Sequence, residues 1–290
     1  MFEFNESLKQ ALARNVQDAL MEDIGTVDWT AQLVRADERV RAHVIIKQNG
    51  AILCGQAWFE LCIKSLDPSA DVMWFYTEGQ VMQAMMPVCE IVCNARALLS
   101  AERSALNFLQ LLSWTASSTK VYVDAIADVD VNPRGCKILE TRKTIPGLRQ
   151  AQKYAVRVGG GKNHRLALWD GILIKENHII ASGSIAAALA NAKALNSGVM
   201  IQIEVESIAE LEEAIAGGAE HILIDDFSIE DMARAVEITQ GRAELEVSGG
   251  VEMTQLRDIA LTGVDRISVG ALTKDVIAID FSMRVLERLA

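Results

Sequence analysis

The chain has 290 residues, enough for one large domain or two modest ones. Half of the residues are hydrophobic and 23% are charged, a balance typical of a globular protein with a substantial core. The formal net charge of -11 argues against non-specific binding to nucleic acid, and no apolar stretch reaches the ~18 residues of a membrane span. The first residues, MFEFNESLKQALARN, lack the basic start and apolar run of a signal peptide. We therefore expect a cytoplasmic protein with no nucleic-acid or membrane partner.

The cysteine content points to the same compartment. The five cysteines are odd in number and form no CxxC pair. We expect reduced structural thiols rather than a disulfide framework or a metal site. The residues concerned are Cys54, Cys62, Cys89, Cys93 and Cys136.

The first third of the chain predicts a small α+β unit. Residues 6–22 form an amphipathic helical pattern, with Leu8, Leu12, Val16 and Leu20 on one side. A β-like region follows, and residues 96–126 then predict one or two helices. The β-like segments are RVRAHVIIK, AILCG, DVMWFY and PVCEIVC.

From about residue 137 the pattern changes to alternating strands and helices. Six short apolar runs recur, and helical patterns separate most of them. Continuously apolar strands in this rhythm indicate a parallel sheet that is buried on both faces. The count is short of eight, so we expect an open, incomplete α/β barrel or one that recruits another segment. The runs are KILET, GILIKE, VMIQIEVE, HILIDD, AELEVSGG and DRISVGA.

Each of these runs ends in polar residues or glycines. Any single one is equally well explained as a helix cap or a solvated turn. Together they indicate a site, because the carboxyl ends of parallel strands form the ligand-binding edge of α/β folds. The groups are Glu140 to Lys143, Lys175, Glu204, Glu206, Asp225, Asp226, Ser248 to Gly250, and Gly270.

The last two strands are followed by glycine turns that open helices, EVSGGVEMTQLR and RISVGALT. Backbone N–H groups at such positions bind phosphate well, although tight strand-to-helix turns alone would also explain them. The acidic ends IEVE and ILIDDF offer carboxylates for acid–base work, for Mg²⁺ or for sugar hydroxyls. ILIDD resembles the acidic loop of Rossmann-like phosphoribosyltransferases, but Phe-Ser follows it instead of Thr-Gly, so we set that match aside.

Positive charge is concentrated between Arg134 and Lys175, with ten Lys or Arg and two acids. A solvated face is the usual explanation of a charge run. Here the basic residues are expected at strand ends and in loops, which favours an anion site. Arg142 can grip a carboxylate as a bidentate fork. GGGKN is not a Walker A loop, because Val156 and Asn163 break its pattern, and no GxGxxG follows a strand.

Three motifs together identify a family. The TRKTIPGLR, GGGKNHR and IKENH segments, followed by VSGGV and ISVGALTK, closely resemble quinolinate phosphoribosyltransferases over nearly the whole chain. The resemblance implies a type II phosphoribosyltransferase fold. An α/β sandwich would come from residues 1–112 with the tail 275–290, and an open α/β barrel from residues 113–274.

The family implies a reaction and its partners. Quinolinate and 5-phosphoribosyl 1-diphosphate would give nicotinate mononucleotide, pyrophosphate and CO₂, with Mg²⁺ as cofactor, in de novo NAD biosynthesis. The enzyme would be a homodimer or an assembly of dimers. In it, the N-terminal domain of one subunit would complete the neighbour's barrel.

The resemblance also implies roles for individual residues. Lys143, Glu204 and Asp225 would be catalytic, and Glu204 and Asp225 would also hold the metal, directly or through water. Apart from the resemblance, we expect His178 to cap or order its loop and Lys162 to be solvated. Quinolinate and diphosphate would be bound by Arg103 (from the partner subunit), Thr141, Arg142, His164, Arg165 and Lys175. The 5-phosphate would be bound by Ser248, Gly249, Gly250 and Gly270.

Two positions depart from the family pattern. Asp226 stands where the family has an amide, which puts the local metal or ribose geometry in doubt. Trp114 replaces a glycine in the helix after Arg103, and we expect it to alter helix packing or a dimer contact rather than the reaction.

Other functions stay open on the residues alone. A relative on the same scaffold would act on a different anionic acceptor. Lys175 would serve as the Schiff-base lysine of an aldolase. A barrel that binds phosphate ligands without turnover would be a sensor. Taken alone, Arg103 would be an ordinary surface arginine.

Overall fold

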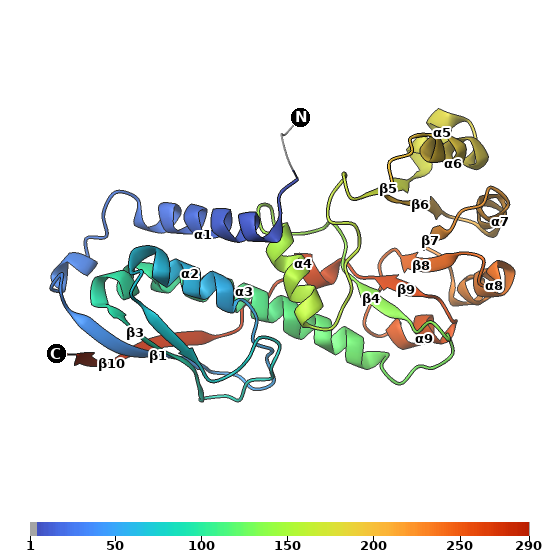
Figure 1. Ribbon diagram of the computed structural model, residues 1–290. Helices are drawn as coiled ribbons and strands as arrows, with labels where there is room; N and C mark the ends of the chain where they lie inside the picture. Colours follow the sequence, from blue (N-terminus) through green and yellow to red (C-terminus); the bar gives the residue numbers. More distant parts are fainter. Residues whose placement is uncertain (1–4, 290) are drawn as a thin grey trace. The chain divides into compact units, whose positions relative to one another are not determined.

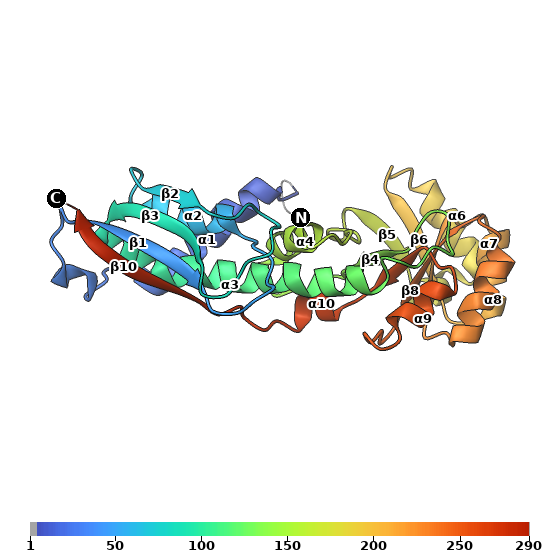
Figure 2. The same cartoon turned by 90° about the horizontal axis from the view of Figure 1, so that it is seen from below.

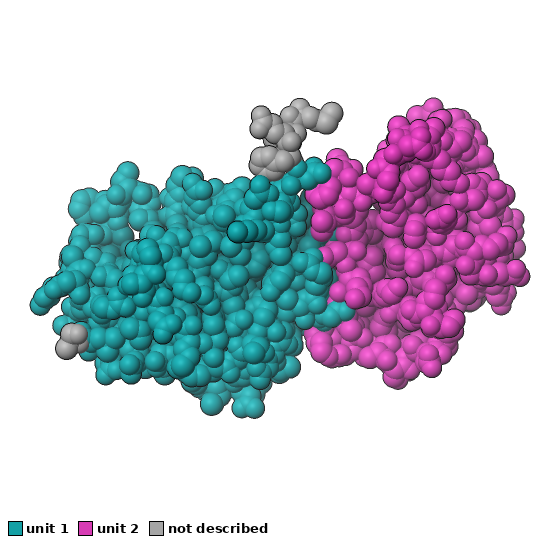
Figure 3. Space-filling model, viewed as in Figure 1, with its two compact units in different colours: residues 1–118, 144–160, 273–290 teal, residues 119–143, 161–272 magenta. Residues whose placement is uncertain are grey.

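The computed structural model describes residues 5–289. Its chain forms two compact units (Figure 3). Unit 1 comprises residues 1–118, 144–160 and 273–290, and unit 2 comprises residues 119–143 and 161–272. The functional domain boundaries expected at 112/113 and 274/275 stay a prediction.

Unit 1 is built on a four-stranded antiparallel sheet in the order β10-β1-β3-β2. Figure 2 shows β10, near the end of the chain, running alongside β1, near its beginning. The tail thus supplies an edge strand to a sheet whose other three strands come from the first third of the chain. The strands are β1 (Arg39–Ile46), β2 (Asp71–Trp74), β3 (Pro87–Asn94) and β10 (Phe281–Leu289).

One face of this sheet is apolar and buried. Along β1, residues alternate between partly exposed and buried, and Val40, Ala42, Val44 and Ile46 form the buried set. The helices of the unit contribute to the same core. They are α1 (Leu8–Ile24), α2 (Gln56–Leu66), α3 (Ala95–Ala125) and α4 (Arg149–Val158), with a 3₁₀ turn at Ala31–Leu33.

Two of these helices match the sequence pattern closely. The expected helix at 6–22 is α1, which a capping box between Ser7 and Gln10 begins. The region 96–126 is the single helix α3, and the division between the two compact units falls inside it. Trp114 on α3 is half-buried, and its indole N–H donates to the carbonyl of Asp275 at 3.0 Å. This tryptophan therefore anchors the segment that leads to β10.

Other elements of unit 1 differ from the prediction. AILCG forms an isolated bridge between Ile52 and Val81 instead of a strand. The segment follows Gly50 and ends at Gly55, and the φ angles of these glycines, 82° and 108°, end the extended backbone. Helix α2 was missed. So was α4, which carries Arg149, Lys153 and Arg157, so the basic segment is not confined to strand ends and loops.

Unit 2 is a six-stranded parallel sheet in the order β4-β9-β8-β7-β6-β5. All six predicted runs form its strands. β4 and β5 are the two edges, so the barrel is open, as expected. The strands are β4 (Lys137–Leu139), β5 (Gly171–Ile174), β6 (Met200–Val205), β7 (His221–Asp225), β8 (Glu244–Ser248) and β9 (Arg266–Ser268).

Helices cover the outside of this sheet, as Figure 1 shows for α6, α7 and α8 beside their strands. The apolar residues of the strands, such as Ile203, Ile222 and Val247, share a core cluster with these helices. The helices are α5 (Glu176–Ser182), α6 (Ile185–Ala194), α7 (Ile208–Ala216), α8 (Ile229–Thr239), α9 (Leu256–Leu261) and α10 (Ala271–Lys274).

The sheet is buried on both faces, as expected, but its strands are not continuously apolar, because the opposite face carries polar residues. Side chains alternate between the two faces of a strand. Residues that alternate with the outward Ile and Val therefore face inward, and several of them are buried and polar, including Gln202, Glu204, Glu246 and Ser268. The strands are therefore apolar toward the helices and mixed toward the interior, where Leu223 lies between Glu204 and Glu246.

Two further expectations can be compared with the described residues. No helix among residues 5–289 is both long and apolar enough to cross a bilayer. All five cysteines are free, as expected, and four are buried. Burial raises the pKa of the Cys62 and Cys136 thiols to about 12 and that of Cys93 to about 11.

Candidate active site

At the carboxyl end of β4, Thr141 and Lys143 lie against Gly270, which follows β9. The backbone N–H of Lys143 donates to the Thr141 hydroxyl at 3.1 Å. A Cβ at Gly270 would lie 3.1 Å from Cδ of Lys143 and 3.6 Å from Oγ1 of Thr141. Glycine at 270 therefore leaves room for the lysine stem, and the exposed ammonium of Lys143 belongs to the mouth of the barrel.

Arg142 and Arg165 place two guanidinium groups in the same region. Burial lowers the pKa of Arg165, and the nearby charge of Arg142 lowers it further. The Nη1 group of Arg165 donates to the carbonyl of Gly171 at 3.0 Å, whereas its buried Nε has no hydrogen-bond partner among residues 5–289. The charge of Arg142 thus acts on Arg165, and an anion bound between the two guanidinium groups would relieve that repulsion, so this pair is a candidate anion-binding feature of unit 2.

His164 precedes this arginine and is itself buried, with 9% of its surface exposed. Its backbone N–H donates to Oε2 of the fully buried Glu140 at 3.1 Å. The glycine run before it contains Gly160, whose φ of 91° is a conformation that glycine adopts without strain. The turn therefore directs His164 inward, as the sequence predicted, while Lys162 on the same turn is exposed and solvated.

Lys175 and Glu204 form an ion pair at the ends of β5 and β6. Nζ of Lys175 lies 2.5 Å from Oε2 of Glu204. The lysine side chain is 44% exposed and the glutamate only 8%, so the carboxylate is fixed and the ammonium reaches solvent. Nδ1 of His178 accepts the backbone N–H of Lys175 at 3.0 Å, which confirms that His178 caps the start of α5.

Glu204 also belongs to a group of carboxylates. One oxygen each from Glu176, Glu204 and Glu206 lie within 4.8 Å of one another. Asp225 is not in this group. Glu204 on β6 pairs with Leu223 on the neighbouring strand β7. Asp225 is the next inward-facing residue of β7 after Leu223. Ordinary strand spacing therefore places its Cα roughly 8 Å from that of Glu204. Both predicted metal residues thus face the same interior.

Asp225 packs against the glycine turn after β8. A Cβ on Gly249 would lie 3.0 Å from Oδ1 of Asp225 and 3.1 Å from the backbone nitrogen of Asp226. Gly249 also has a φ of 93°, so any side chain there is strained as well as obstructed. Asp226 has a φ of 59°, a left-handed conformation that Asp and Asn tolerate better than most residues. Aspartate at position 226, where the family has an amide, is therefore compatible with this backbone turn.

A pocket of about 260 Å³ opens at this turn. Ser248, Gly249 and Gly250 line it together with the start of α8, where Ser228 caps the helix by accepting the backbone N–H of Asp231. Gly270 does not line it and lies beside Lys143 instead. The predicted phosphate-binding residues thus fall into two places in unit 2, three at one turn and one at another.

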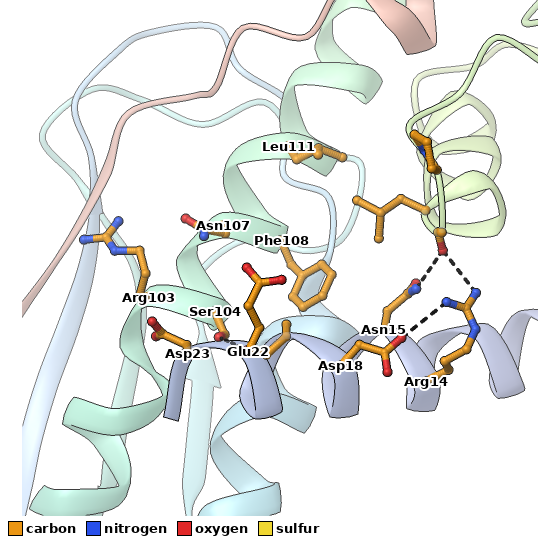
Figure 4. Close-up of a pocket in the computed structure, with 14 residues that line it drawn as sticks. Arg14, Asn15, Asp18, Glu22, Asp23, Arg103, Ser104, Asn107, Phe108 and Leu111 are labelled. Atoms are coloured by element: carbon orange, nitrogen blue, oxygen red, sulfur yellow. Dashed lines mark hydrogen bonds and ion pairs between the residues drawn. The ribbon is translucent and has the colours of Figure 1, made fainter. Parts of the chain in front are cut away.

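Arg103 belongs to unit 1, on α3. It is exposed, and its guanidinium has no ion-pair or hydrogen-bond partner within the described part of the chain. Figure 4 shows it at one end of a pocket of about 330 Å³, with Arg14 and Asn15 at the other end. Both of those side chains donate to the carbonyl of Gly147, at 3.1 and 2.9 Å. Helix α1 thereby fixes the Pro146–Leu148 turn that follows the predicted substrate-binding residues.

Sequence reasoning missed several buried polar residues of the barrel. Glu246 and Gln202 are 1% exposed and Ser268 is 5% exposed. A signal for them existed, because IQIEVE and ELEVS alternate polar and apolar residues with a period of two. Lys153, fully buried on α4, was also missed.

Comparison with known proteins identifies the family. The C-terminal domain model of quinolinate phosphoribosyl transferase matches residues 115–284, and the N-terminal domain model matches residues 28–113. The chain belongs to the quinolinate phosphoribosyltransferase family.

Individual relatives agree with this assignment over almost the whole length. A probable nicotinate-nucleotide pyrophosphorylase [carboxylating] of Bacillus subtilis is 39% identical, over 91% of this chain and 90% of the relative. A mitochondrial quinolinate phosphoribosyltransferase [decarboxylating] of Nicotiana tabacum is 36% identical, over 95% and 82%.

Solved structures of the family superpose on the fold. The nicotinate-nucleotide pyrophosphorylase of Francisella tularensis aligns with a TM-score of 0.91 at 44% identity, over 99% of this chain and 100% of that one. NadC of Streptococcus pyogenes aligns with the same TM-score at 36% identity, again over 99% and 100%. The open barrel and the sandwich are therefore the architecture of the family.

Proposed function

We propose that this chain transfers the phosphoribosyl group of 5-phosphoribosyl 1-diphosphate to the ring nitrogen of quinolinate and releases pyrophosphate and CO₂. The product is nicotinate mononucleotide, the pyridine nucleotide that enters NAD biosynthesis. The chain is thus a decarboxylating pentosyltransferase. The family match over residues 28–113 and 115–284 and the relatives named for this activity support the assignment.

The observation that carries the proposal is the paired guanidinium groups of Arg142 and Arg165. Quinolinate is a planar dianion, and two arginines can each grip a carboxylate with a bidentate fork. Thr141 and His164 directly precede these two arginines in the chain, and we assign them to the same site. Binding the dianion relieves the repulsion between the two cations, so the site is electrostatically matched to a dicarboxylate.

Lys143 and Lys175 face the other charged groups of the reaction. Both reach solvent at the carboxyl ends of strands, where the diphosphate would leave. As the bond between ribose and diphosphate breaks, negative charge grows on the departing oxygen and positive charge grows on the ribose. The lysines stabilise the first, and the carboxylates of Glu204 and Asp225 stabilise the second while they hold ribose hydroxyls.

The turn after β8 is the proposed site of the 5-phosphate. Ser248, Gly249 and Gly250 line a pocket at the start of α8, where backbone N–H groups favour an anion. No lysine or arginine is among the described residues that line it. Backbone and hydroxyl groups would therefore do most of the binding. Gly270 would contribute indirectly, through the position of Lys143.

The donor set at β6 and β7 fits Mg²⁺. This ion prefers oxygen ligands, keeps several waters, and takes one or two carboxylates plus substrate phosphates. Glu204 and Asp225 supply such carboxylates, and Glu176 and Glu206 lie close enough to add oxygens around Glu204. When bound, Mg²⁺ neutralises charge on the diphosphate. Asp226 offers a further carboxylate where the family has an amide.

Decarboxylation follows transfer for a chemical reason. Bonding of the ring nitrogen to C1 of the ribose makes the pyridine ring cationic. The bond between C2 and its carboxylate then breaks, its electron pair stays on the ring, and C2 takes a proton as CO₂ leaves. The residues that bind the carboxylates hold the substrate in the orientation for transfer, and release of CO₂ makes the overall reaction irreversible.

The proposal includes a homodimer, or a larger assembly of dimers, in a cytoplasmic enzyme. Arg103 lies exposed on α3 without a partner in the described residues, as expected for a side chain that acts in a neighbouring subunit. We assign it to the quinolinate site of that neighbour. Sedimentation of the purified chain would test the dimer, and mixing Arg103→Ala subunits with Lys175→Ala subunits would test the sharing of sites. Activity recovered in the mixture would support shared sites, and a mixture that stays inactive would count against them.

The direct test supplies quinolinate, 5-phosphoribosyl 1-diphosphate and Mg²⁺ to the purified chain and measures CO₂ and nicotinate mononucleotide. Both should form in equal amounts, and omission of either substrate should abolish both. A relative that acts on another anionic acceptor is the alternative. A panel of pyridine and purine carboxylates would reveal it as turnover of another compound without quinolinate turnover.

A Schiff-base aldolase is not favoured by the geometry. A lysine nucleophile of that class is desolvated in an apolar pocket. Lys175 is 44% exposed and forms an ion pair with Glu204. Borohydride treatment in the presence of carbonyl compounds should leave no adduct on Lys175.

A further inference from the structure

Beneath the mouth of the barrel, a buried carboxylate joins residues from three strands and one loop. Oε2 of Glu246 on β8 accepts the side-chain amide of Gln202 on β6 at 3.0 Å. Its Oε1 accepts the hydroxyl of Ser268 on β9 and lies 3.4 Å from Nε2 of His164. All four residues are at least nine-tenths buried, and Glu246 is 1% exposed. We call this set the Glu246 network.

Hydrogen bonding defines the state of the histidine in this network. The backbone N–H of Arg165 donates to Nδ1 of His164 at 2.7 Å, so Nδ1 carries no proton. The ring proton is therefore on Nε2, the nitrogen that faces Glu246. A carboxylate at that position stabilises this tautomer and turns the ring so that Nδ1 meets the backbone of Arg165.

The network also lies directly under the proposed active site. Side chains two residues apart share one face of a strand, so each strand member is followed on the inward face by a proposed site residue. Gln202 precedes Glu204, Glu246 precedes Ser248, and Ser268 precedes Gly270. His164 adjoins Arg165 in the loop. One carboxylate thus connects the segments assigned to ribose, phosphate and quinolinate.

We infer that Glu246 is a positioning residue, which holds the Nε2–H tautomer of His164 and thereby sets Arg165 for quinolinate. The inference rests on the proposed function. A buried carboxylate is costly, and a purely structural site is filled as well by an apolar residue of the same size. Here three side chains converge on the carboxylate. Each member of the network stands next to, or two residues before, a residue of the proposed active site.

The test variant is Glu246→Gln, which keeps shape and most hydrogen bonds. Oε1 of Gln202 is buried without a hydrogen-bond partner in the described chain. A flip of that amide would let it accept from the new glutamine, whose own oxygen still faces Ser268 and His164. Only the negative charge opposite His164 is lost. The KM for quinolinate should rise roughly 5- to 10-fold, because the negative charge 3.4 Å from Nε2 of His164 is replaced by a neutral amide.

Binding of the other substrate by the Glu246→Gln variant should change little. The KM for 5-phosphoribosyl 1-diphosphate should stay within about threefold, because the ties to Gln202 and Ser268 remain. Glu244→Gln is the matched control. It removes a carboxylate from the same strand at the end away from the mouth, where Glu244 contacts His221 and Arg266. It should lower the melting temperature and leave the KM for quinolinate unchanged.

A swap variant separates positioning from stability. Glu246→Gln with Gln202→Glu keeps one carboxylate and one amide in the network but moves the charge away from His164. It should keep the buried carboxylate and the wild-type melting temperature and leave the KM for quinolinate raised. A wild-type KM for quinolinate in Glu246→Gln, or in the swap variant, would overturn the inference. A wild-type chain without quinolinate turnover would instead refute the proposed function.

Discussion

The two sheets of this protein distribute polar residues in opposite ways. The four-stranded sheet of unit 1 buries apolar side chains such as Val44 and Ile46 and leaves Arg41 and His43 on its partly exposed face. The six-stranded sheet of unit 2 turns its apolar residues outward to helices and buries Gln202, Glu204 and Glu246 inside. Burial of a charge costs free energy unless it is paired. Such residues in a barrel interior therefore indicate a site, whereas the sandwich sheet is organised for stability.

This contrast predicts that substitutions in the barrel interior change turnover more than stability. The largest effect is expected for Glu204→Gln. The variant removes charge opposite the developing positive ribose and should lower kcat by about 10²- to 10³-fold, the size found when one electrostatic contact to a transition state is lost. Steady-state assays measure it. Glu220→Gln, exposed just before β7, is the control and should behave as wild type. Wild-type kcat in Glu204→Gln would exclude this role.

The next effect is expected for Arg142→Ala. Loss of a bidentate, charge-assisted contact should weaken quinolinate binding by roughly 30- to 100-fold. Calorimetric titration with quinolinate measures it, and the melting temperature should hardly change. Lys162→Ala removes a cation from the same basic segment at an exposed position and should bind quinolinate normally. Equal affinities of the two variants would contradict the assignment of Arg142.

Unit 1 should respond in the opposite way. Ile91 is fully buried at the centre of its sheet. Ile91→Val should reduce the free energy of unfolding by about 1 kcal/mol through the lost methylene and the space it leaves. Denaturant unfolding measures that loss. The KM for quinolinate should stay at the wild-type value, and a change in KM without a change in stability would break the contrast between the sheets.

The smallest effect is expected when thiol reagents are added to the native chain, because most of the cysteines belong to the apolar core of unit 1. Burial raises the pKa of Cys62 to about 12 and of Cys93 to about 11, so both are thiols at pH 8 and react slowly. Because these pKa values are raised, the stability they contribute is complete below pH 9 and is lost as the pH rises toward 11 and 12. Colorimetric thiol titration should find these two cysteines in the unfolded chain only. Rapid labelling of the native chain would contradict this.

Much of the barrel was predictable because its local signals are strong. Six apolar runs with polar ends became six strands, and at the glycine turns of Gly249 and Gly270 a Cβ would lie within 3.1 Å of a neighbouring atom. Helices α2 and α4 were missed for a physical reason. Trp58, Phe59, Cys62 and Ile63 pack at helical spacing, but they follow β-like segments, and α4 lies within a segment whose basic residues suggested loops.

The interior of the barrel was less predictable. Residues at the strand ends stand out in the sequence because charge follows an apolar run. Glu246 lies inside a strand, and its partners Gln202, Ser268 and His164 come from distant parts of the chain. Only the pairing of the strands brings them together. A period-two reading of ELEVS would have shown which face Glu246 occupies, but not what it meets there.

Turnover by the purified chain tests the central claim most directly. Quinolinate labelled in its 2-carboxylate is incubated with 5-phosphoribosyl 1-diphosphate and Mg²⁺, and labelled CO₂ is measured beside nicotinate mononucleotide. The polar interior of the barrel predicts equal yields of both that depend on both substrates and fall sharply in Glu204→Gln. No labelled CO₂ from the folded protein, or equal release by wild type and Glu204→Gln, would contradict the account.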